Sequence, residues 1–399
     1  MPTGPNKFGV FLAPFHALHE DPTQALRRDM DLVEHLDNLG FYEVWVGEHH
    51  SGGFEIIAAP EIFIAAAAER TKHIRLGTGV KSLPFHNPRM LADQMVQLDH
   101  MTMGRTMFGV GPGALPFDAL QIGIDPADTR RRMNESLDVL IPLLEGETVT
   151  KKTDWFDLWQ ARLQLPPYTK PRMEMAVTSI NSPSGVIAAG KYGLGVLVLG
   201  GMSDAALAQH AENWRICEET AKENGRKANR DDWRITTYMH LAETKEQARA
   251  DLEFGFNDWL AYSRAVLPAT PIPPEAHGDQ DPLEWGMENS FCCVGTPDDV
   301  IREIERVYKG VGGFGTMLLL AHNWAPWPAA QKSYELFARY VMPHFTGNRD
   351  SRIDSYNWAA NHHDEFVSRS RTASQASRDA YERSVKLAKT KESAAKRKK

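Results

Sequence analysis

The sequence has little cysteine and no long apolar run. Its 399 residues include three cysteines, Cys217, Cys292 and Cys293. An odd number with two adjacent is a poor disulfide framework and fits a reducing compartment. No run approaches eighteen apolar residues, which argues against a membrane span. The N-terminus lacks a cationic segment followed by a long apolar stretch, which argues against a signal peptide. These absences predict a soluble cytoplasmic protein.

Several nucleotide and metal motifs are also missing. There is no G-x-G-x-x-G after the first strand, no G-x-x-x-x-G-K-[ST] and no H-E-x-x-H. The sequence therefore gives no support for a Rossmann fold, a P-loop or a zinc protease. A net charge of −7 gives no general attraction to nucleic acid. Only the C-terminal "SVKLAKTKESAAKRKK" is basic, and a solvated tail is favoured there over a nucleic-acid or membrane arm.

What the chain does contain is a regular alternation of short apolar runs and amphipathic stretches. Each apolar run is too short for a stable helix and is followed by a helical pattern. The expected strands are 8–14, 42–50, 74–83, 105–113, 174–179, 195–200, 233–242 and 315–323. Eight strand–helix units favour a closed (β/α)8 TIM barrel, an α/β fold, over an open sheet.

Two insertions interrupt this alternation. Residues 147–173, after the fourth strand, are expected to form a short hairpin or loop. Residues 265–290, after the seventh strand, are rich in proline and polar residues and are expected to form a lid or a disordered segment. We expect residues 1–346 to form the barrel domain. Residues 347–399 would be a basic C-terminal extension, partly helical or disordered.

The end of the second strand carries three titratable residues, Glu48-His49-His50. Active sites of TIM barrels lie at the carboxyl ends of the strands, and histidine titrates near neutral pH. These residues therefore predict proton transfer or stabilisation of an anion. A surface histidine pair remains an alternative. So does a metal site if His86, His240 and His322 converge, although no metal is expected.

Small residues follow the next strands. Three glycines in "GVGPGALPFD" could leave one wall open for a flat ring, or could mark places where layers crowd. In "TSINSPSG", a set of small residues precedes a helix and could hold a phosphate or simply cap that helix. This set is Asn181, Ser182, Ser184 and Gly185.

These segments resemble the luciferase-like flavin-dependent monooxygenase superfamily. The matching segments include "GFYEVWVGEHH", "IRLGTGVKSLPFHNPRMLADQMVQLDHMTMGR", "FGVGPG", "NSPSG", "VGTPDDV" and "LFARYVMPHF", in order over about residues 7–345. Two further segments, "GIDPADTRRRMNESLDVL" and "DWFDLWQARLQLPPYTKPRMEMAV", look most like the limonene-monooxygenase-like branch. The resemblance implies a homodimeric enzyme that receives reduced FMN from a separate NAD(P)H:flavin reductase.

The resemblance assigns roles to individual residues. His49 matches the family's active-site histidine, which supports a flavin C4a-hydroperoxide formed with O2. Gly79-Val80 matches a non-proline cis peptide against the isoalloxazine ring. The "NSPSG" turn matches the phosphate site. Gly111-Pro112 stands beside the flavin where bacterial luciferase has Cys-Arg, so light emission is not expected.

The sequence leaves open which cation binds the phosphate and which residues form the substrate pocket. Lys191 or Arg172 could replace the missing arginine at the phosphate. Four apolar residues near strand ends could form a substrate pocket or belong to the core: Phe11, Phe85, Leu115 and Trp324.

The expected function is insertion of one oxygen atom from O2 into a small apolar, terpene-like substrate such as limonene. The alternatives are an F420-dependent oxidoreductase of the same fold and a non-catalytic flavin-binding protein. No nucleic-acid partner is expected.

Overall fold

The computed structural model describes residues 4–12, 15–180, 182–267, 272 and 280–396. Contacts within the chain separate it into two units, Met1–Thr346 and Gly347–Lys399. The first unit contains all of the strands, and the second consists of helices. Of the predicted lid, 265–290, residues 268–271 and 273–279 lie outside the described ranges, whereas Pro282–Glu288 form a short helix.

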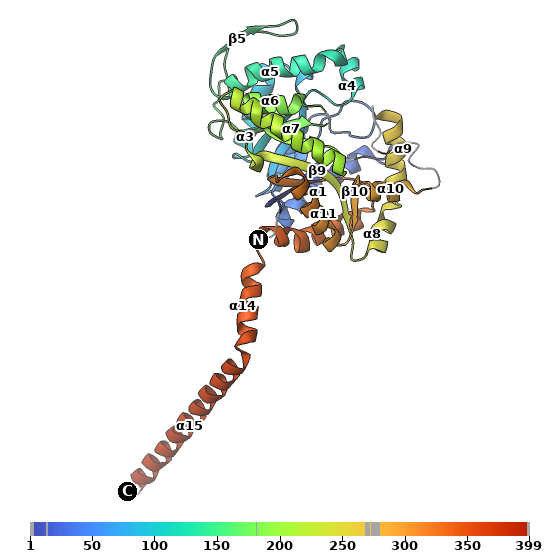
Figure 1. Ribbon diagram of the computed structural model, residues 1–399. Helices are drawn as coiled ribbons and strands as arrows, with labels where there is room; N and C mark the ends of the chain where they lie inside the picture. The colour runs from blue at the N-terminus through green and yellow to red at the C-terminus, as the bar shows by residue number, and fades with distance from the viewer. Residues whose placement is uncertain (1–3, 13–14, 181, 268–271, 273–279, 397–399) are drawn as a thin grey trace. The chain divides into compact units, whose positions relative to one another are not determined.

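The first unit is a closed barrel of eight parallel strands surrounded by helices (Figure 1). Around the ring each strand pairs with its neighbours in chain order, and β11 pairs with β1 to close it. The barrel strands are β1 Lys7–Leu12, β2 Glu43–Val46, β3 Arg75–Ser82, β4 Thr106–Gly111, β7 Glu174–Ser179, β8 Gly195–Leu199, β9 Trp233–Leu241 and β11 Thr316–Leu320. The TIM barrel is confirmed, and each predicted segment contains most of one barrel strand, although β2 ends at Val46, earlier than predicted, and residues 13–14 lie outside the described part.

Helices cover the outside of the barrel, and many of them begin with proline, whose fixed φ suits the first helical turn. Asp21 and Asn87 cap two of these helices by accepting hydrogen bonds from backbone N–H groups. The helices of the first unit are α1 Pro22–Leu39, α2 Pro60–Arg70, α3 Pro88–Met101, α4 Pro116–Gln121, α5 Thr129–Leu144, α6 Ser184–Tyr192, α7 Asp204–Glu223, α8 Lys245–Leu252, α9 Phe256–Val266, α10 Pro282–Glu288, α11 Pro297–Val311, α12 Trp327–Leu336 and α13 Met342–Thr346.

Two features lie outside the eightfold repeat. The antiparallel hairpin of β5 Val149–Lys152 and β6 Asp157–Ala161 occupies the first predicted insertion, as the hairpin alternative proposed. A short strand, β10 Cys292–Gly295, pairs in parallel with β9 outside the closed ring. The sequence did not predict β10, because four residues containing two cysteines carry no strand periodicity.

The barrel interior is filled by apolar side chains, among them the fully buried indole of Trp45. A Cβ at Gly77 would lie 2.5 Å from that ring, and one at Gly109 would lie 3.0 Å from it. A Cβ at Gly111 would lie 2.6 Å from the Val80 side chain. The space beside these glycines is therefore filled by the protein itself. At these positions only glycine leaves room for the neighbouring atoms, as the crowded-layer alternative proposed, and the predicted contact of Gly111 with a flavin stays a prediction.

A buried ion cluster closes the amino-terminal end of the barrel. Arg234 Nε lies 2.6 Å from Glu43 Oε1, and its Nη2 lies 2.5 Å from Glu174 Oε1. Each of these three residues lies at or next to the start of its strand. Because TIM-barrel sites form at the opposite end, we assign this cluster to stability.

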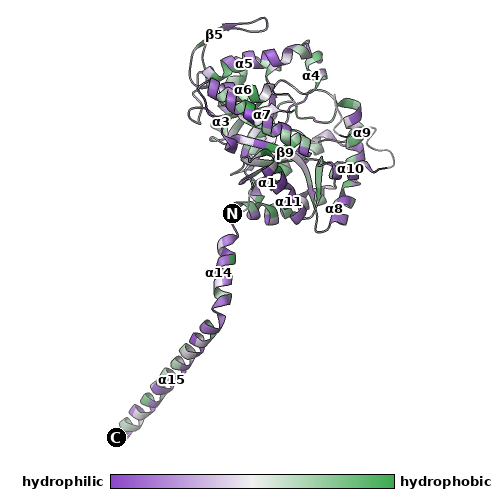
Figure 2. Cartoon of the chain, viewed as in Figure 1, coloured by the Kyte–Doolittle hydropathy of each residue, from purple (hydrophilic) through white to green (hydrophobic). Residues whose placement is uncertain are grey.

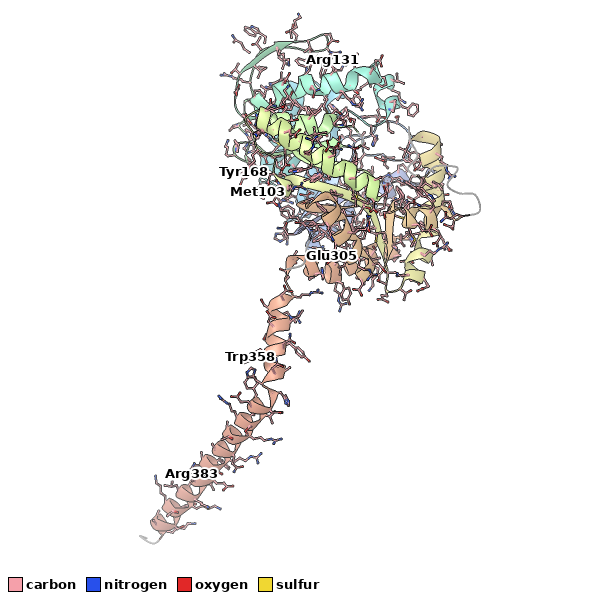
Figure 3. All side chains as sticks on the ribbon, viewed as in Figure 1. Met103, Arg131, Tyr168, Glu305, Trp358 and Arg383 are labelled. Carbon is pink, nitrogen blue, oxygen red and sulfur yellow. The ribbon has the colours of Figure 1, made fainter. Side chains whose placement is uncertain are left out.

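The second unit contains α14 Asp350–Asn361 and α15 His363–Lys396. Neither helix has a buried residue, and Figure 2 shows hydrophilic and hydrophobic residues interspersed along both. Figure 3 shows the side chains of Trp358 and Arg383 extending from these helices. In the parts of the chain that the structure describes, no helix is long and apolar enough to cross a membrane.

Candidate active site

His49 lies just after β2, at the carboxyl end of the barrel, between two carboxylates. Its Nδ1 lies 3.1 Å from Asp118 Oδ2, and its Nε2 lies 3.1 Å from Glu55 Oε2. The side chain is 15% exposed. Burial lowers the pKa of His49, but the charges and hydrogen bonds of the two carboxylates outweigh it and raise the pKa to about 10. At neutral pH the ring is therefore an imidazolium.

Asp118, in the first turn of α4, organises the segment around His49. Besides the imidazole, it accepts hydrogen bonds from the backbone N–H of His50 at 3.2 Å and from Ser51 Oγ at 2.5 Å. Burial raises the pKa of Asp118, but hydrogen bonds from His49 and Ser51 lower it below its usual value. The sequence analysis missed Asp118, although it follows β4 within the quoted "GVGPGALPFD".

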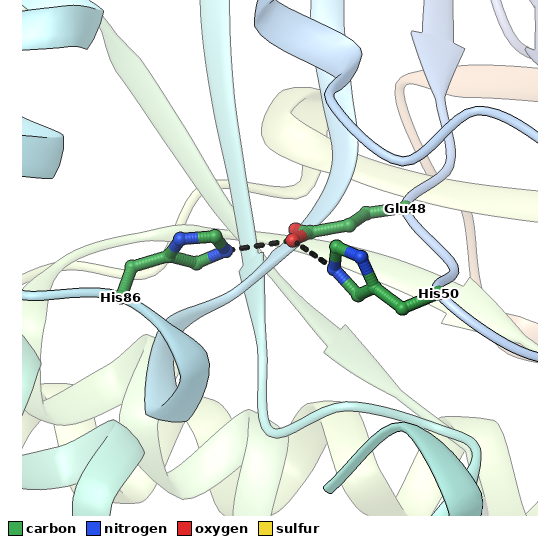
Figure 4. Close-up of side chains that lie close together, drawn as sticks. All are labelled: Glu48, His50 and His86. Carbon is green, nitrogen blue, oxygen red and sulfur yellow. Dashed lines mark hydrogen bonds and ion pairs between the residues drawn. The ribbon is translucent and has the colours of Figure 1, made fainter. Parts of the chain in front are cut away.

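A second cluster lies beside the first and joins Glu48 to two histidines (Figure 4). Glu48 Oε1 accepts hydrogen bonds from His50 Nε2 at 2.9 Å and from His86 Nε2 at 2.6 Å. Lys81 Nζ lies 3.5 Å from the same oxygen and 2.8 Å from Glu61 Oε2. Although burial raises the pKa of Glu48, these partners lower it to about 2. The ionised carboxylate of Glu48, which follows β2, therefore links the end of β2 to Lys81 of β3.

The metal alternative from the sequence is not supported in its stated form. His86 lies with Glu48, whereas His240 and His322 lie together with ring centroids 5.7 Å apart. Among the described residues, Glu48, His50 and His86 form the one group spaced for a cation, within 4.8 Å. There the ammonium of Lys81 already supplies a positive charge 3.5 Å from the bridging carboxylate.

The predicted phosphate turn leads into the amino terminus of α6. The hydroxyls of Ser182 and Ser184 lie 2.8 Å apart. A Cβ at Gly185 would collide with the Thr178 carbonyl oxygen, so glycine lets this turn lie close against β7. Asn181 lies outside the described residues. Two hydroxyls at the positive end of a helix form a donor set suited to an anion.

Lys191 and Arg172, considered as replacements for the missing arginine, do not lie at the phosphate turn of Ser182 and Ser184. Lys191, near the carboxyl end of α6, donates to Tyr192 Oη at 2.7 Å and pairs with Asp138 at 3.3 Å. Arg172 precedes the start of β7, at the opposite end of the strand, and its Nε lies 3.2 Å from Glu145 Oε1. The expectation that either compensates at the phosphate turn is wrong, because neighbouring carboxylates hold both.

The Gly79–Val80 peptide bond is cis, as the resemblance implied. Its contact with a flavin remains a prediction. A Cβ at Gly79 would lie 2.8 Å from the Cβ of Trp45, so the strand can pass the indole only with glycine there. Val80 follows at the barrel mouth beside Gly111.

A cavity of about 50 Å³ lies at the mouth of the barrel, beside His49 and its partner Glu55. Its walls include Phe15, Glu55, Tyr238, Trp259, Tyr262 and His322. Glu55 therefore joins the cavity to His49. Three of its aromatic residues, Tyr238, Trp259 and Tyr262, come from β9 and α9, and the sequence analysis did not single them out.

None of the four predicted pocket residues lines this cavity within the described part of the chain. Phe11 is buried in the barrel interior, and Trp324 is buried in an aromatic cluster with Tyr238 and Trp259. Leu115 is buried, and Phe85 is half-buried with its ring centroid 6.1 Å from that of His50. Phe11 and Trp324 therefore pack in the core, which was the alternative to a place in the substrate pocket.

Comparison with known proteins gives a consistent relationship. The family model for luciferase-like monooxygenases matches residues 6–313. Limonene 1,2-monooxygenase of Rhodococcus erythropolis is 47% identical over 355 residues, covering 89% of this chain and 90% of that protein. The 4-hydroxyprotoasukamycin monooxygenase of Streptomyces nodosus subsp. asukaensis is 45% identical, covering 88% of this chain and 96% of that protein.

Among solved structures, the oxygenating constituent of 3,6-diketocamphane monooxygenase from Pseudomonas putida has the same fold. Its TM-score is 0.73 at 24% identity, covering 85% of this chain and 98% of that one. That protein, a type II Baeyer–Villiger monooxygenase, was solved in complex with FMN.

Proposed function

The chain belongs to the luciferase-like monooxygenase family, and on that premise we propose that it is the oxygenase of a two-component system. It would take reduced FMN from a separate NAD(P)H:flavin reductase and insert one atom of O2 into a small apolar substrate. The observation that carries this proposal is the position of His49 between Asp118 and Glu55, beside an aromatic cavity. Residues 1–346 would be the catalytic domain, active as a homodimer in the cytoplasm.

The residues present fit the phosphate end of FMN. Ser182 and Ser184 supply two hydroxyls, and the amino terminus of α6 supplies backbone N–H groups. Gly185 lets the turn approach β7 closely. No arginine is needed for the fold of this turn, and FMN would be held as an exchangeable cosubstrate. Reduced flavin, when bound, supplies the electrons that activate O2.

His49 would stabilise negative charge and move a proton at Nε2. This is the ring nitrogen on the cavity side, because Nε2 faces Glu55 and Glu55 lines the cavity. Nδ1 is held by Asp118, which fixes the ring orientation. An imidazolium at this position, charged at neutral pH, favours an anion over a neutral group.

Aromatic walls would exclude water from the reacting centre. Tyr238, Trp259 and Tyr262 line the mouth cavity, and a dry site protects reactive oxygen species from hydrolysis or loss. These apolar walls also favour an apolar substrate. The relationship to limonene 1,2-monooxygenase makes a cyclic terpene the first substrate to test.

The test is an anaerobic titration of the purified protein with reduced FMN and, separately, with reduced F420. Limonene and isotope-labelled O2 are then added, and the product is examined by mass spectrometry. Binding of reduced FMN and one labelled oxygen in the product support the proposal. Binding of reduced F420 alone would indicate the oxidoreductase alternative. FMN binding without oxygenation of any of a panel of apolar substrates would indicate a non-catalytic flavin-binding protein.

A further inference from the structure

The long helix α15 ends in a basic segment of an otherwise acidic chain. In residues 383–399, eight residues are lysine or arginine and one, Glu392, is acidic, which gives this segment a net charge of +7. Because the whole chain has a net charge of −7, the remainder carries −14. Among the described residues, no carboxylate lies within ion-pair distance of five of these cations, which are Arg383, Lys386, Lys389, Lys391 and Lys396. Their charge is therefore available to an anionic partner.

The larger apolar side chains of α15 lie on one side of the helix, and cations lie on the other. An α-helix turns about 100° per residue, so the place of each side chain around the axis follows from its number. The larger apolar residues fall within about 160° of the circumference. They are Phe366, Val367, Tyr381, Val385 and Leu387. The opposite side is charged and includes Arg378, Arg383, Lys386, Lys389 and Lys396. The hydrophobic and hydrophilic residues that Figure 2 shows along α15 therefore separate around its axis.

Charged residues interrupt the apolar side near its two ends. Arg369, near the amino terminus of α15, pairs with Glu365 at 2.6 Å. Lys391 and Glu392 lie near the carboxyl terminus. Between residues 373 and 388 the apolar side holds larger apolar residues, alanine and serine, and no charge. The helix is therefore amphipathic over about four turns.

The apolar side is exposed to solvent. The helix has no buried residue, and Tyr381 is 71% exposed and Leu387 60% exposed. Trp358 of α14, labelled in Figure 3, has its ring centroid 5.1 Å from that of Phe366 and is itself 58% exposed. Tyrosine and tryptophan combine an apolar body with a polar tip, which suits the boundary between water and hydrocarbon. Transfer of these side chains into an apolar layer would be favourable.

An anionic lipid surface matches both sides of α15, whereas two other partners match one side each. The phosphates of a nucleic acid would pair with the cations but leave Val385 and Leu387 in water. A second α15 aligned in parallel would cover these apolar residues but would bring the same lysines together. At a bilayer surface the anionic headgroups meet the cations, and the acyl chains meet the apolar side.

We propose that α15 binds the surface of an anionic lipid bilayer and lies along it, with its apolar side at the acyl chains and its cations at the phosphates. The sequence favours a solvated tail because a run of lysines shows charge alone, and the two sides separate only when the helix forms. Binding of this kind requires neither flavin nor turnover. Its failure would therefore leave the monooxygenase proposal untouched.

Vesicle binding by the full-length protein tests the proposal. The flavin-free protein is sedimented with sucrose-loaded vesicles, either of phosphatidylcholine alone or with about one third phosphatidylglycerol to supply the anionic charge. We expect saturable binding to the anionic vesicles, at least about tenfold tighter than to the neutral ones, because each cation near an anionic surface contributes about fivefold. Binding should weaken as salt is raised, since the cations are exposed. Equal binding to both kinds of vesicle, or no binding to the anionic ones, overturns the proposal.

Removal of two cations tests the charged side. Lys386→Gln combined with Lys389→Gln should weaken binding to the anionic vesicles about twentyfold, because two charges are lost. Lys222→Gln combined with Lys227→Gln removes two exposed charges from the barrel unit and is the matched control. An equal loss of binding in both double variants would show that charge acts through the whole protein, and would overturn the role of α15.

Shortening of two apolar side chains tests the other side. Val385→Ala combined with Leu387→Ala preserves helix-forming tendency but removes apolar area, and should weaken binding about tenfold. Leu165→Ala, at a side chain of the barrel unit that is 46% exposed, is the control and should bind like the wild type. Unchanged binding in the α15 variant would contradict contact with the acyl chains and overturn the proposal.

The two other partners predict different results. Double-stranded DNA at the same salt should bind more weakly than the anionic vesicles, and tighter binding of DNA would overturn the proposal in favour of a nucleic acid. The oligomeric state, measured by sedimentation equilibrium, should be the same in the wild type and in the variant with Val385→Ala and Leu387→Ala. A changed oligomeric state with unchanged vesicle binding would assign the apolar side to a second copy of the chain and overturn the proposal.

Discussion

His49 Nε2 lies 3.1 Å from Glu55 Oε2, and Glu55 is at the same time part of the wall of the mouth cavity. The carboxylate of Glu55 therefore lies between His49 and the cavity. Any group that receives a proton from Nε2 must replace Glu55 or act through it. In the proposed mechanism the two residues would act together in proton transfer, with Asp118 fixing the histidine from the other side.

Replacing His49 by alanine should uncouple the reaction while leaving FMN binding mostly intact. The imidazolium that stabilises negative charge is lost, whereas the phosphate turn at Ser182 and Ser184 is unchanged. We expect more hydrogen peroxide and less oxygenated product per reduced FMN consumed, with His73→Ala, an exposed histidine, as the control. Unchanged coupling in His49→Ala would remove the residue from the mechanism.

The Glu55→Gln variant should shift the pH dependence of activity and stability. In the wild-type protein the pKa of His49 is raised to about 10 from its ordinary 6.5. The charged ring therefore stabilises the native state fully below pH 6.5, and this contribution is lost as the pH rises towards 10. Without Glu55 the pKa of His49 should be raised less, so the contribution should be smaller and should be fully lost at a lower pH.

This shift can be followed by the nuclear magnetic resonance titration of His49 and by the alkaline limb of kcat/KM. Glu253→Gln, at an exposed carboxylate of the outer surface, is the matched control. An alkaline limb at the same pH in Glu55→Gln and wild type would show that Glu55 does not set the protonation of His49.

Asp118→Asn should lower both stability and activity. The carboxylate accepts hydrogen bonds from His49, Ser51 and the His50 backbone. Loss of the charge at such a buried acceptor costs about 1–3 kcal/mol, measured by denaturant unfolding. Activity should fall more than ten-fold, because the ring of His49 is no longer oriented (an order-of-magnitude figure). Ser51→Ala, which removes one of the three bonds, should have the smaller effect on both, and the reverse order would contradict this role.

Removing the hydroxyls of the phosphate turn should weaken FMN binding. Ser182→Ala and Ser184→Ala each remove a donor from the pair that lies 2.8 Å apart. Each change should raise the Kd for reduced FMN by roughly three- to tenfold, with little effect on kcat at saturation. Ser182→Thr keeps the hydroxyl and should stay near the wild type. Wild-type affinity in the double alanine variant would place the phosphate elsewhere.

Gly77→Ala should destabilise the barrel. The added methyl group would lie 2.5 Å from the indole of Trp45, which is fully buried and packed inside the barrel. Overpacking of this kind costs about 1–3 kcal/mol, measured by thermal or denaturant unfolding. Gly201→Ala is the control, because a Cβ there meets only Ala206 at 3.9 Å. Equal stability of the two variants would show that the interior is loosely packed.

Much of the fold could be predicted because each barrel strand has a recognisable pattern in its own short stretch of sequence. Buried parallel strands are continuous apolar runs, and the helices between them have a 3.6-residue period with proline or capping residues at their starts. The short β10 has no such signal. It exists because β9 leaves an edge free beyond the closed ring, which is a property of the assembled barrel.

The sequence by itself determined the barrel and, through the family resemblance, the position of His49 and the cis bond at Gly79–Val80. It could not determine the partners of His49, because Asp118 is 69 residues away and meets it only when the ends of β2 and β4 share one rim. The cavity walls, the pairing of Lys191 and Arg172, and the packing of Trp45 against Gly77 and Gly109 were likewise decided by tertiary structure. Side-chain distances and packed volumes depend on how distant segments close in space, and a linear pattern carries only the local part of that information.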